Sequence, residues 1–495
     1  MTGNSEGQQL LSDSNESSIS AVAFVRRHRI KILAISAAVS IPCFWHKHME
    51  AGDLASHVYN AWLTTLIERG QAPGLYLVHQ WSNVLFDMLL THLGALLGFG
   101  AAEKILACGS ILIFFWGAFA LIFAVSRQAP WFLTPAIAAL AYGWTFECGF
   151  NNFYLSVAFA FWSMALLWNA RGWRLAAGIV LMPLAWLAHP LGCFLALGGF
   201  LYVLASKHLP GWWKATPFLA SLFIVVATRS YLAHHLIVQW PRFHWTVNGI
   251  DQMILAVRYR PLAEAVFFSG LLFLSIDAWL RREDPAFWAR ISLPAGLYVV
   301  TMAGVLLLPD SIVIPQYDRP FGPFAWRVSL IAGIFAVGVL GCLKPRIVYV
   351  LAFGVAALIF FVFLWQDTGK IADLESQAEK LLAPLPQGSR VMVTLYPTDA
   401  SRLYFMNHIV DRACIGHCFS YGNYEPSTKQ FRVRVLPGSP VVASASITSN
   451  EMQTGTYVVQ AKDLPVFQIM RCTATDDKLC LRELHAGEVN GSAFP

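Results

Sequence analysis

The stretch "VLFDMLLTHLGALLGF", residues 84–99, decides the fold, because counting it as a membrane span reverses the side on which every later loop lies. It is strongly apolar, yet it carries Asp87 and His92, and ionisable side chains are costly in hydrocarbon. Counting it would also move most later basic loops to the outer side, against the cytoplasmic excess of Lys and Arg. We therefore predict an amphipathic helix that lies at the membrane surface.

The chain around this stretch is too apolar for a soluble protein. Of its 495 residues, 56% are hydrophobic and 13% are charged, whereas about a quarter of the residues of a soluble protein are charged. The net charge of +6 is spread over short loops, and no basic tract indicates nucleic acid. The composition indicates a polytopic membrane protein in a lipid bilayer, with no nucleic-acid partner.

Apolar runs of about 20 residues can cross a bilayer if tilt and imperfect ends are allowed. Basic loops such as "RRHRIK" (26–31), "RRED" (281–284) and "LKPR" (343–346) then all lie on one side, which the positive-inside rule makes cytoplasmic. The first outer loop covers about residues 46–103. We predict eleven spans, near 30–45, 104–126, 130–147, 151–169, 174–188, 190–206, 215–233, 261–280, 290–309, 324–342 and 346–365.

The predicted fold class is an α-helical polytopic membrane protein with interfacial helices in its long first outer loop. Residues 1–29 are polar and predict a disordered cytoplasmic tail, and residues 30–365 form the membrane domain. Residues 366–495 are polar again and predict a small external α+β domain. Its strand-like runs are "RVMVTLY" (390–396), "QFRVRVL" (430–436) and "TYVVQ" (456–460).

Four of the nine cysteines fall outside the membrane pattern, in the close pairs "CIGHC" (414–418) and "CTATDDKLC" (472–480). An external, oxidising compartment favours disulfides among Cys414, Cys418, Cys472 and Cys480. A zinc site that uses Cys414, His417 and Cys418 is the alternative, although this spacing is a weak zinc signal.

The first outer loop opens with "GDLASHVYNAW", residues 52–62. On a helix, Asp53, His57, Asn60 and Thr64 form one polar stripe, which is the ordinary face that a surface helix turns to water. The alternative is that Asp53 is a general base at the bilayer edge, where partial burial raises its pKa toward the working pH. Glu50, one turn earlier, is the weaker candidate for that role.

The order of these parts resembles the GT-C superfamily of integral-membrane glycosyltransferases. Three stretches are similar to its bacterial members: "GDLASHVYNAWLTTLIERGQAPGLY" (52–76), "WTFECGFNNFYLSVAFAFWSMALL" (144–167) and "PLAWLAHPLGCFLAL" (183–197). The resemblance implies sugar transfer from a polyprenyl-phosphate-linked donor to a glycan, lipid or protein acceptor at the outer face of a bacterial-type inner membrane. It also implies that Asp53 is the catalytic base, with His57 as its positioning neighbour.

The resemblance leaves metal dependence open. Some GT-C members bind a divalent metal through acidic outer-loop motifs, but the first loop of this chain has no Asp-x-Asp. We therefore assign no cofactor from the sequence and name no metal ligand.

A phosphate carrier requires cations on the same side as Asp53. Outer arginines violate the positive-inside rule, and they either bind donor phosphate or anchor the protein at the interface. His189 and Asn152 are further candidates, with capping of span ends as the simpler alternative. The substrate-binding candidates are Arg229, Arg242, Arg258, Arg260, Arg319, His189 and Asn152.

A different class of function also fits the sequence: a non-catalytic transporter or assembly protein for lipid-linked glycans. Such a protein would carry paired ionisable groups deep in its spans. The predicted span centres are nearly free of charge, which argues mildly against transport.

Overall fold

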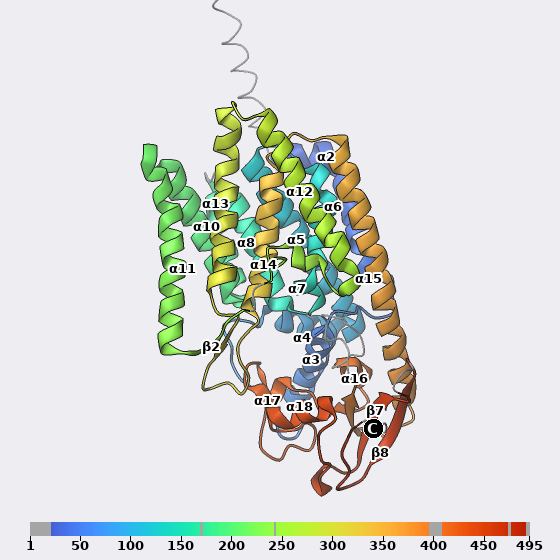
Figure 1. The fold of residues 1–495 in the computed structure, drawn as a ribbon. Coiled ribbons are helices and arrows are strands. Elements are labelled where there is room, and N and C mark those ends of the chain that lie inside the picture. The colour runs from blue at the N-terminus through green and yellow to red at the C-terminus, as the bar shows by residue number, and fades with distance from the viewer. Residues whose placement is uncertain (1–20, 169–171, 242–243, 396–407, 474–476, 492–495) are drawn as a thin grey trace, which may run out of the picture.

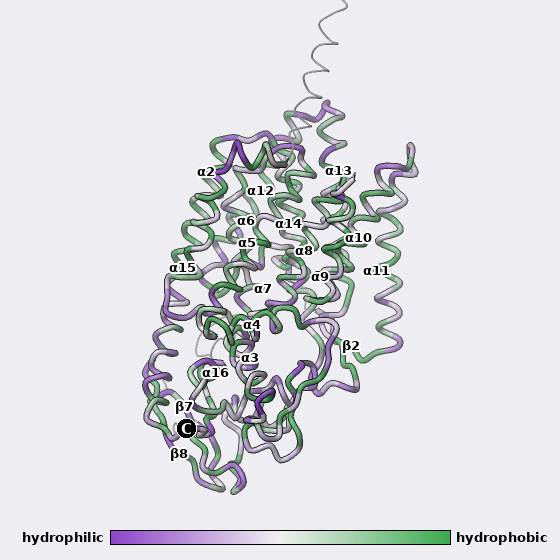
Figure 2. Tube along the Cα trace, turned by 180° about the vertical axis from the view of Figure 1, so that it is seen from behind, coloured by the Kyte–Doolittle hydropathy of each residue, from purple (hydrophilic) through white to green (hydrophobic). Residues whose placement is uncertain are grey.

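The computed structural model describes residues 21–168, 172–241, 244–395, 408–473 and 477–491. A bundle of helices makes up most of the molecule, and a smaller layer of short helices and strands lies at one end of it (Figure 1). The hydrophobic residues follow the bundle, while the small layer is mixed in character (Figure 2).

Six helical segments in the described ranges are long and apolar enough to cross a membrane, judged by length and composition. They are α5 (Phe99–Ser126), α10 (Pro190–His208), α11 (Thr216–His235), α12 (Arg260–Leu280), α13 (Pro285–Leu307) and α15 (Ile347–Leu382). The other apolar helices in the described ranges are shorter: α4 (Leu85–Leu97), α8 (Asn151–Leu167), α9 (Trp173–Ala188) and α14 (Phe324–Leu340). All of these long and short helices except α4 coincide with predicted spans.

The predicted span at 130–147 is not one continuous helix. It consists of the turn η2 (Trp131–Leu133), α6 (Thr134–Ala141) and α7 (Trp144–Glu147), interrupted at Gly143. Glycine is a poor helix former, and here a Cβ at Gly143 would lie 2.9 Å from the Leu140 carbonyl oxygen.

The deciding stretch 84–99 forms α4 (Leu85–Leu97), a helix of 13 residues. At 1.5 Å per residue it is about 20 Å long, which is too short to cross a hydrocarbon core of about 30 Å by itself. It packs against α3 (Leu54–Glu68) and α5. The structure therefore gives this stretch a helix shorter than a full span, and its place at the membrane surface stays a prediction.

Both predicted borders of the membrane domain fall inside helices. The first helix, α2 (Ala21–Ser40), begins at Ala21, so the disordered tail predicted to reach residue 29 is wrong from residue 21 onward. The basic run lies on this helix because Lys and Arg are good helix formers. At the other border, α15 continues without a break to Leu382 and includes the helix predicted within the external domain.

The C-terminal layer contains a four-stranded sheet with strand order β5-β4-β7-β8. Its strands are β4 (Arg390–Thr394), β5 (Phe419–Ser420), β7 (Val466–Arg471) and β8 (Leu479–Leu484). Strand β4 is parallel to β5 and β7, and β8 is antiparallel to β7. The strand predicted at 456–460 is wrong, since this run makes only an isolated bridge between Val458 and Val489. The short helices of this layer are α16 (Ile409–Ala413), α17 (Glu425–Thr428) and α18 (Ser446–Thr454).

Two short ribbons join segments that are distant in sequence. Strand β6 (Val433–Val435) pairs antiparallel with β1 (Leu75–Leu77), which lies in the segment predicted as the first outer loop. Strand β2 (Ile237–Gln239) pairs antiparallel with β3 (Ser311–Val313). The first outer loop and the C-terminal layer are therefore one packed unit.

Helix α3 lies between the bundle and the C-terminal layer instead of facing water. Its Tyr59 and Leu63 share a hydrophobic core with residues of β4 and α16, and the Tyr59 hydroxyl accepts a hydrogen bond from the Ser420 amide at 3.0 Å. The predicted water-facing stripe is consequently wrong, because His57 and Asn60 are only 7% and 6% exposed.

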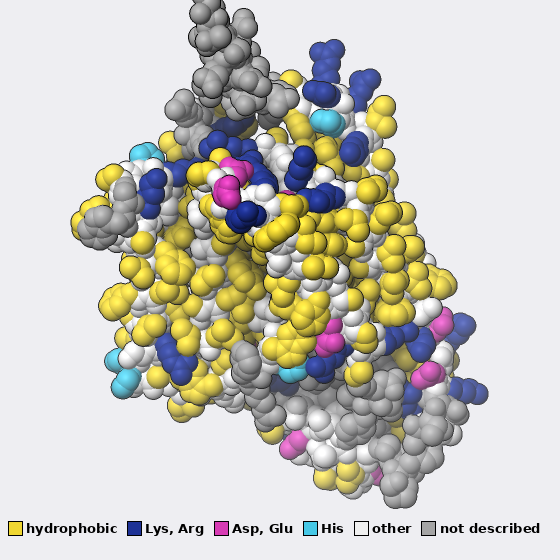
Figure 3. Space-filling model, turned by 45° about the horizontal axis from the view of Figure 1, so that its top comes forward, with side chains coloured by type: hydrophobic (Ala, Val, Ile, Leu, Met, Phe, Trp, Pro, Cys, Tyr) yellow, Lys and Arg dark blue, Asp and Glu magenta, His cyan; other side chains and the backbone are white. Residues whose placement is uncertain are grey.

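Lys and Arg side chains gather at the end of the bundle where α2 begins, above a broad hydrophobic belt (Figure 3). The C-terminal layer lies at the opposite end (Figure 1).

Candidate functional site

A cavity of about 220 Å³ lies where the bundle meets the C-terminal layer. Its lining comes from the start of α3, the turn before α4, the start of α8, the junction of α9 and α10, the loop before α14 with the first turn of α14, and the segment that contains α17. The cavity brings together five of the predicted site residues, namely Asp53, His57, Asn152, His189 and Arg319.

Two turns, each containing a glycine, hold Asp53 at the N-terminus of α3. Gly52 has φ +24° and Gly149 has φ +78°, and a Cβ at Gly52 would lie 2.4 Å from the Cys148 carbonyl oxygen. The Asp53 amide donates to that same oxygen at 3.1 Å. The two backbones can approach this closely because the glycines carry no side chain.

The Asp53 side chain does not cap α3, although the residue stands at the N-cap position. One carboxylate oxygen, Oδ1, lies 3.3 Å from Nε2 of His408. The other, Oδ2, accepts a hydrogen bond from the Tyr424 hydroxyl at 3.2 Å. His408 in turn contacts Asp411, with 2.8 Å between its Nδ1 and Oδ2. The C-terminal layer thus supplies the partners of Asp53.

The electrostatics of Asp53 differ from the prediction. Burial raises its pKa, but the hydrogen bond and charge of His408 outweigh burial and hold the pKa below its usual value. Burial likewise lowers the pKa of His408, while Asp411 and Asp53 raise it to about 10. Near neutral pH the pair is therefore carboxylate and imidazolium.

His57, the predicted positioning neighbour of Asp53, forms its hydrogen bond with Asp87. Its Nδ1 lies 2.6 Å from Asp87 Oδ1. Asn152 holds Asp87 in place, since its Nδ2 donates to Asp87 Oδ2 at 2.7 Å and its Oδ1 accepts from the Phe86 amide at 2.8 Å. Burial lowers the pKa of His57, but Asp87 raises it to about 9, so His57 adds a positive charge to the cavity wall.

Arg319 and Arg327 line the cavity, and neither forms an ion pair with a carboxylate in the described part of the chain. Arg319 donates to the Ser446 hydroxyl and stacks 4.5 Å from the Tyr424 ring centroid. Arg327 donates to the Gly322 carbonyl and lies 3.8 Å from the Phe150 ring centroid. One buried nitrogen of each guanidinium has no hydrogen-bond partner among these residues. Two partly buried cations that form no ion pair among the described residues are suited to an anion, which they can bind bidentately.

Four other predicted residues do not line this cavity. Glu50 lies in a separate buried cluster around Arg412. Arg229 stacks 4.1 Å from the Trp240 ring centroid, and Arg258 and Arg260 form ion pairs with Asp367 and Glu264. Arg242 lies outside the described residues.

His189 lines the cavity and also caps α10. Its Nδ1 accepts a hydrogen bond from the Leu191 amide at 3.2 Å, which is the capping geometry that the sequence offered as the simpler explanation. Its place in the wall of the cavity is compatible with both roles.

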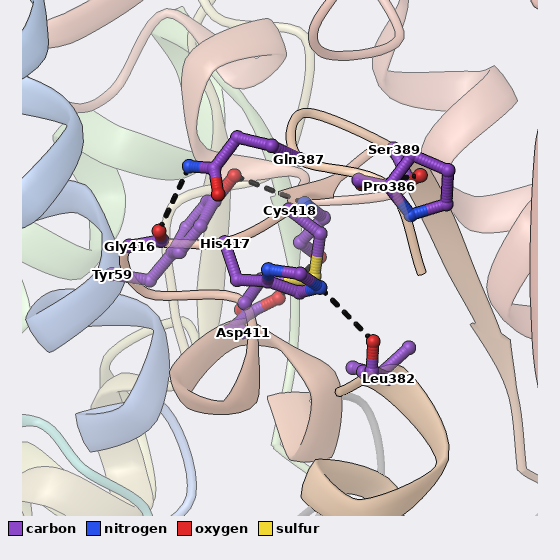
Figure 4. The surroundings of a disulfide bond; sticks show 11 residues. Tyr59, Leu382, Pro386, Gln387, Ser389, Asp411, Gly416, His417 and Cys418 are labelled. Carbon is purple, nitrogen blue, oxygen red and sulfur yellow. Dashed lines mark hydrogen bonds between the residues drawn. A yellow bond between two sulfur atoms is a disulfide. The ribbon is translucent and has the colours of Figure 1, made fainter. Parts of the chain in front are cut away.

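The C-terminal cysteines form two disulfides, Cys414–Cys418 and Cys472–Cys480. The first removes the thiolates that a zinc site would need, and Nε2 of His417 lies 3.0 Å from the Leu382 carbonyl oxygen instead (Figure 4). Tyr59 of α3 lies beside this turn, as Figure 4 shows. In the described ranges, no group of three or more His, Cys, Asp or Glu side chains could hold a metal ion.

Sequence reasoning missed His408 and Tyr424 as members of the site. Tyr424 lies in "SYGNYEPSTKQFRVR" (420–434), whose interleaved aromatics were the only signal. No sequence pattern marked His408 as a site residue, because its role depends on a contact with Asp53, which is far from it in the sequence. Comparisons with family models, curated proteins and solved structures found no match to this chain.

Proposed function

We propose that this protein is a GT-C-type glycosyltransferase that moves a sugar from a polyprenyl-phosphate-linked donor to a glycan, lipid or protein acceptor. The observation that carries the proposal is the cavity at the end of an apolar bundle, where the Asp53 carboxylate faces two arginines that have no counter-ion among the described residues. One wall can accept a proton, and the other can bind a departing phosphate.

In this mechanism an acceptor hydroxyl donates a hydrogen bond to Asp53 and attacks the anomeric carbon. The bond from that carbon to the phosphate oxygen breaks, and the phosphate leaves with the electron pair. Asp53 takes the hydroxyl proton, while Arg319 and Arg327 stabilise the charge that develops on the phosphate. A single displacement of this kind inverts the anomeric configuration.

The membrane arrangement that fits this mechanism has eleven spans, with α4 at the surface. The end of the bundle rich in Lys and Arg would be cytoplasmic, and the cavity and C-terminal domain would face the outer side of a bacterial-type inner membrane. The donor's lipid would then lie in the outer leaflet, beside the apolar faces of the bundle.

Label transfer in proteoliposomes tests the proposed function. The purified chain would be given a panel of polyprenyl phosphates, each carrying one radiolabelled hexose or pentose, together with an envelope extract as acceptor. We expect label from one donor to enter the acceptor fraction. Movement of a donor between leaflets without transfer would overturn the proposal in favour of a transporter.

A further inference from the structure

His408 lies between two carboxylates, and one of them, Asp53, lines the cavity. Its Nε2 is 3.3 Å from Asp53 Oδ1, and its Nδ1 is 2.8 Å from Asp411 Oδ2. Both His408 and Asp411 are almost fully buried, at 2% and 1% exposure. The second Asp411 oxygen accepts a hydrogen bond from the Ser420 hydroxyl, so Asp411 is itself fixed within the C-terminal layer.

We propose that His408 and Asp411 are positioning residues through which the C-terminal domain orients the Asp53 carboxylate toward the acceptor hydroxyl. The inference rests on the proposed function and extends it, because it makes the C-terminal domain part of the catalytic unit.

The geometry of Asp53 supports this role. His408 contacts one oxygen and Tyr424 donates to the other, so two groups from one domain hold the two oxygens of a single carboxylate. A carboxylate bonded at both oxygens has little freedom to rotate, yet each oxygen keeps lone-pair capacity for another donor. The Asp53 side chain is still 27% exposed, which leaves room for a hydroxyl to approach from the cavity.

The charged groups around the pair favour an ionised Asp53. The positive charge of His57 also lowers the pKa of Asp53. The Asp53 carboxylate in turn interacts electrostatically with Arg319, Arg327 and the Glu425 carboxyl. Asp411 and Asp53 are the two groups that raise the pKa of His408. The centroid of the His408 ring lies 5.4 Å from that of the Tyr424 ring. The cationic groups are His408, His57, Arg319 and Arg327, and they outnumber the carboxyl groups Glu425, Asp411 and Asp87. Of these cations, His408 is the one that forms an ion pair with Asp53. Removing His408 should therefore make Asp53 easier to protonate.

The experiment compares His408→Gln, Asp411→Asn and the double variant with the wild type in the label-transfer assay, across pH 4 to 9. His417→Gln is the matched control, since His417 belongs to the same domain and contacts the Leu382 carbonyl away from the cavity. The double variant removes the imidazolium and the Asp411 carboxylate together, so neither of these two buried groups is left charged without the other. Thermal unfolding and disulfide content verify the fold of each variant.

We expect His408→Gln and the double variant to lower kcat at least tenfold with donor KM changed less than about twofold, because the arginines are untouched. The acid limb of the kcat profile should move up by roughly one pH unit, and His417→Gln should match the wild type. Unchanged kcat and pH profile in a folded His408→Gln protein would overturn the inference while leaving the proposed function standing. A wild-type protein that transfers no sugar would overturn both.

Discussion

The carboxylate of Asp53, ahead of α3, lies 3.3 Å from the imidazole of His408, ahead of α16. The first residue belongs to the segment predicted as the first outer loop, and the second belongs to the C-terminal layer. Because β1 and β6 also pair across these two parts, the contact is supported by a continuous packed unit. The catalytic carboxylate of our proposal therefore depends on a domain that follows the whole helical bundle in sequence.

Replacing either cavity arginine should weaken donor binding. Arg319→Gln and Arg327→Gln each remove a charged hydrogen-bond donor from the anion site, and such bonds contribute about 1.5–3 kcal/mol. We expect donor KM to rise about 10- to 100-fold for each variant. Arg260→Gln is the control, since Arg260 pairs with Glu264 outside the cavity. Equal effects in all three variants would argue against an anion site at Arg319 and Arg327.

The His57 and Asp87 pair should make stability depend on pH in a defined window. The pKa of folded His57 is about 9, raised from an ordinary 6.5, so its protonated form favours the folded state. This stabilisation is fully present below pH 6.5 and is lost as pH rises through 9.

We therefore expect wild type to melt several degrees above His57→Gln at pH 6, with the difference closing above pH 9. Scanning fluorimetry of the detergent-solubilised proteins measures this difference. A gap that widens with rising pH would contradict the assigned charge state.

Gly52→Ala should impair activity without touching any polar group of the site. An added Cβ would lie 2.4 Å from the Cys148 carbonyl oxygen, so the turn that carries Asp53 must shift. A displacement of about 1 Å at a catalytic group can cost about 100-fold in rate. We expect kcat to fall by roughly this factor, whereas Gly109→Ala in α5 meets no atom within 4 Å and should be neutral. Normal turnover by Gly52→Ala would show that the position of Asp53 is not critical.

Arg412 should be required for the C-terminal layer to pack against the helical bundle, where it contacts Glu103 of α5 and Glu375 of α15. Its guanidinium lies 2.6 Å from Glu375 and 2.8 Å from Glu103, with Glu50 at 3.9 Å, and all four side chains are buried. Arg412→Met leaves three buried carboxylates without their cation, and breaking a buried pair costs about 3–5 kcal/mol.

We expect a lower melting temperature for Arg412→Met and faster proteolysis of residues 383–495. Arg282→Met is a suitable control, because Arg282 is 59% exposed and its surface pair should contribute little. Equal stability of the two variants would mean that the cluster does not hold the domain.

Much of the helical bundle could be predicted from the sequence, since apolar runs and basic loops report directly on length and charge. The prediction that residues 84–99 form a helix at the membrane surface came from the distribution of basic loops and from Asp87 and His92, and the structure gives Asp87 a partner in His57. The break at Gly143 and the extension of α15 to Leu382 were missed, because hydropathy does not report where a helix bends or continues.

The sequence predicted only those parts of the site whose residues are close together in the chain. The two turns that hold Asp53 and Asn152 were both recognised as motifs, but the sequence could not show that Gly52 packs on Cys148. The polar stripe on α3 was predicted to face water, because no pattern within the helix itself reveals that the C-terminal layer covers it. His408 was missed for the same reason, and it is the partner that sets the ionisation of Asp53.

The most direct test of the account is single-turnover transfer from the labelled polyprenyl-phosphate donor by Asp53→Asn. Asp318→Asn is the matched control, because Asp318 makes an exposed ion pair with Lys429 and does not line the cavity. We predict that Asp53→Asn still binds the donor, but transfers sugar at least about 1,000-fold more slowly than wild type, while Asp318→Asn matches wild type. Undiminished transfer by folded Asp53→Asn protein would contradict the account.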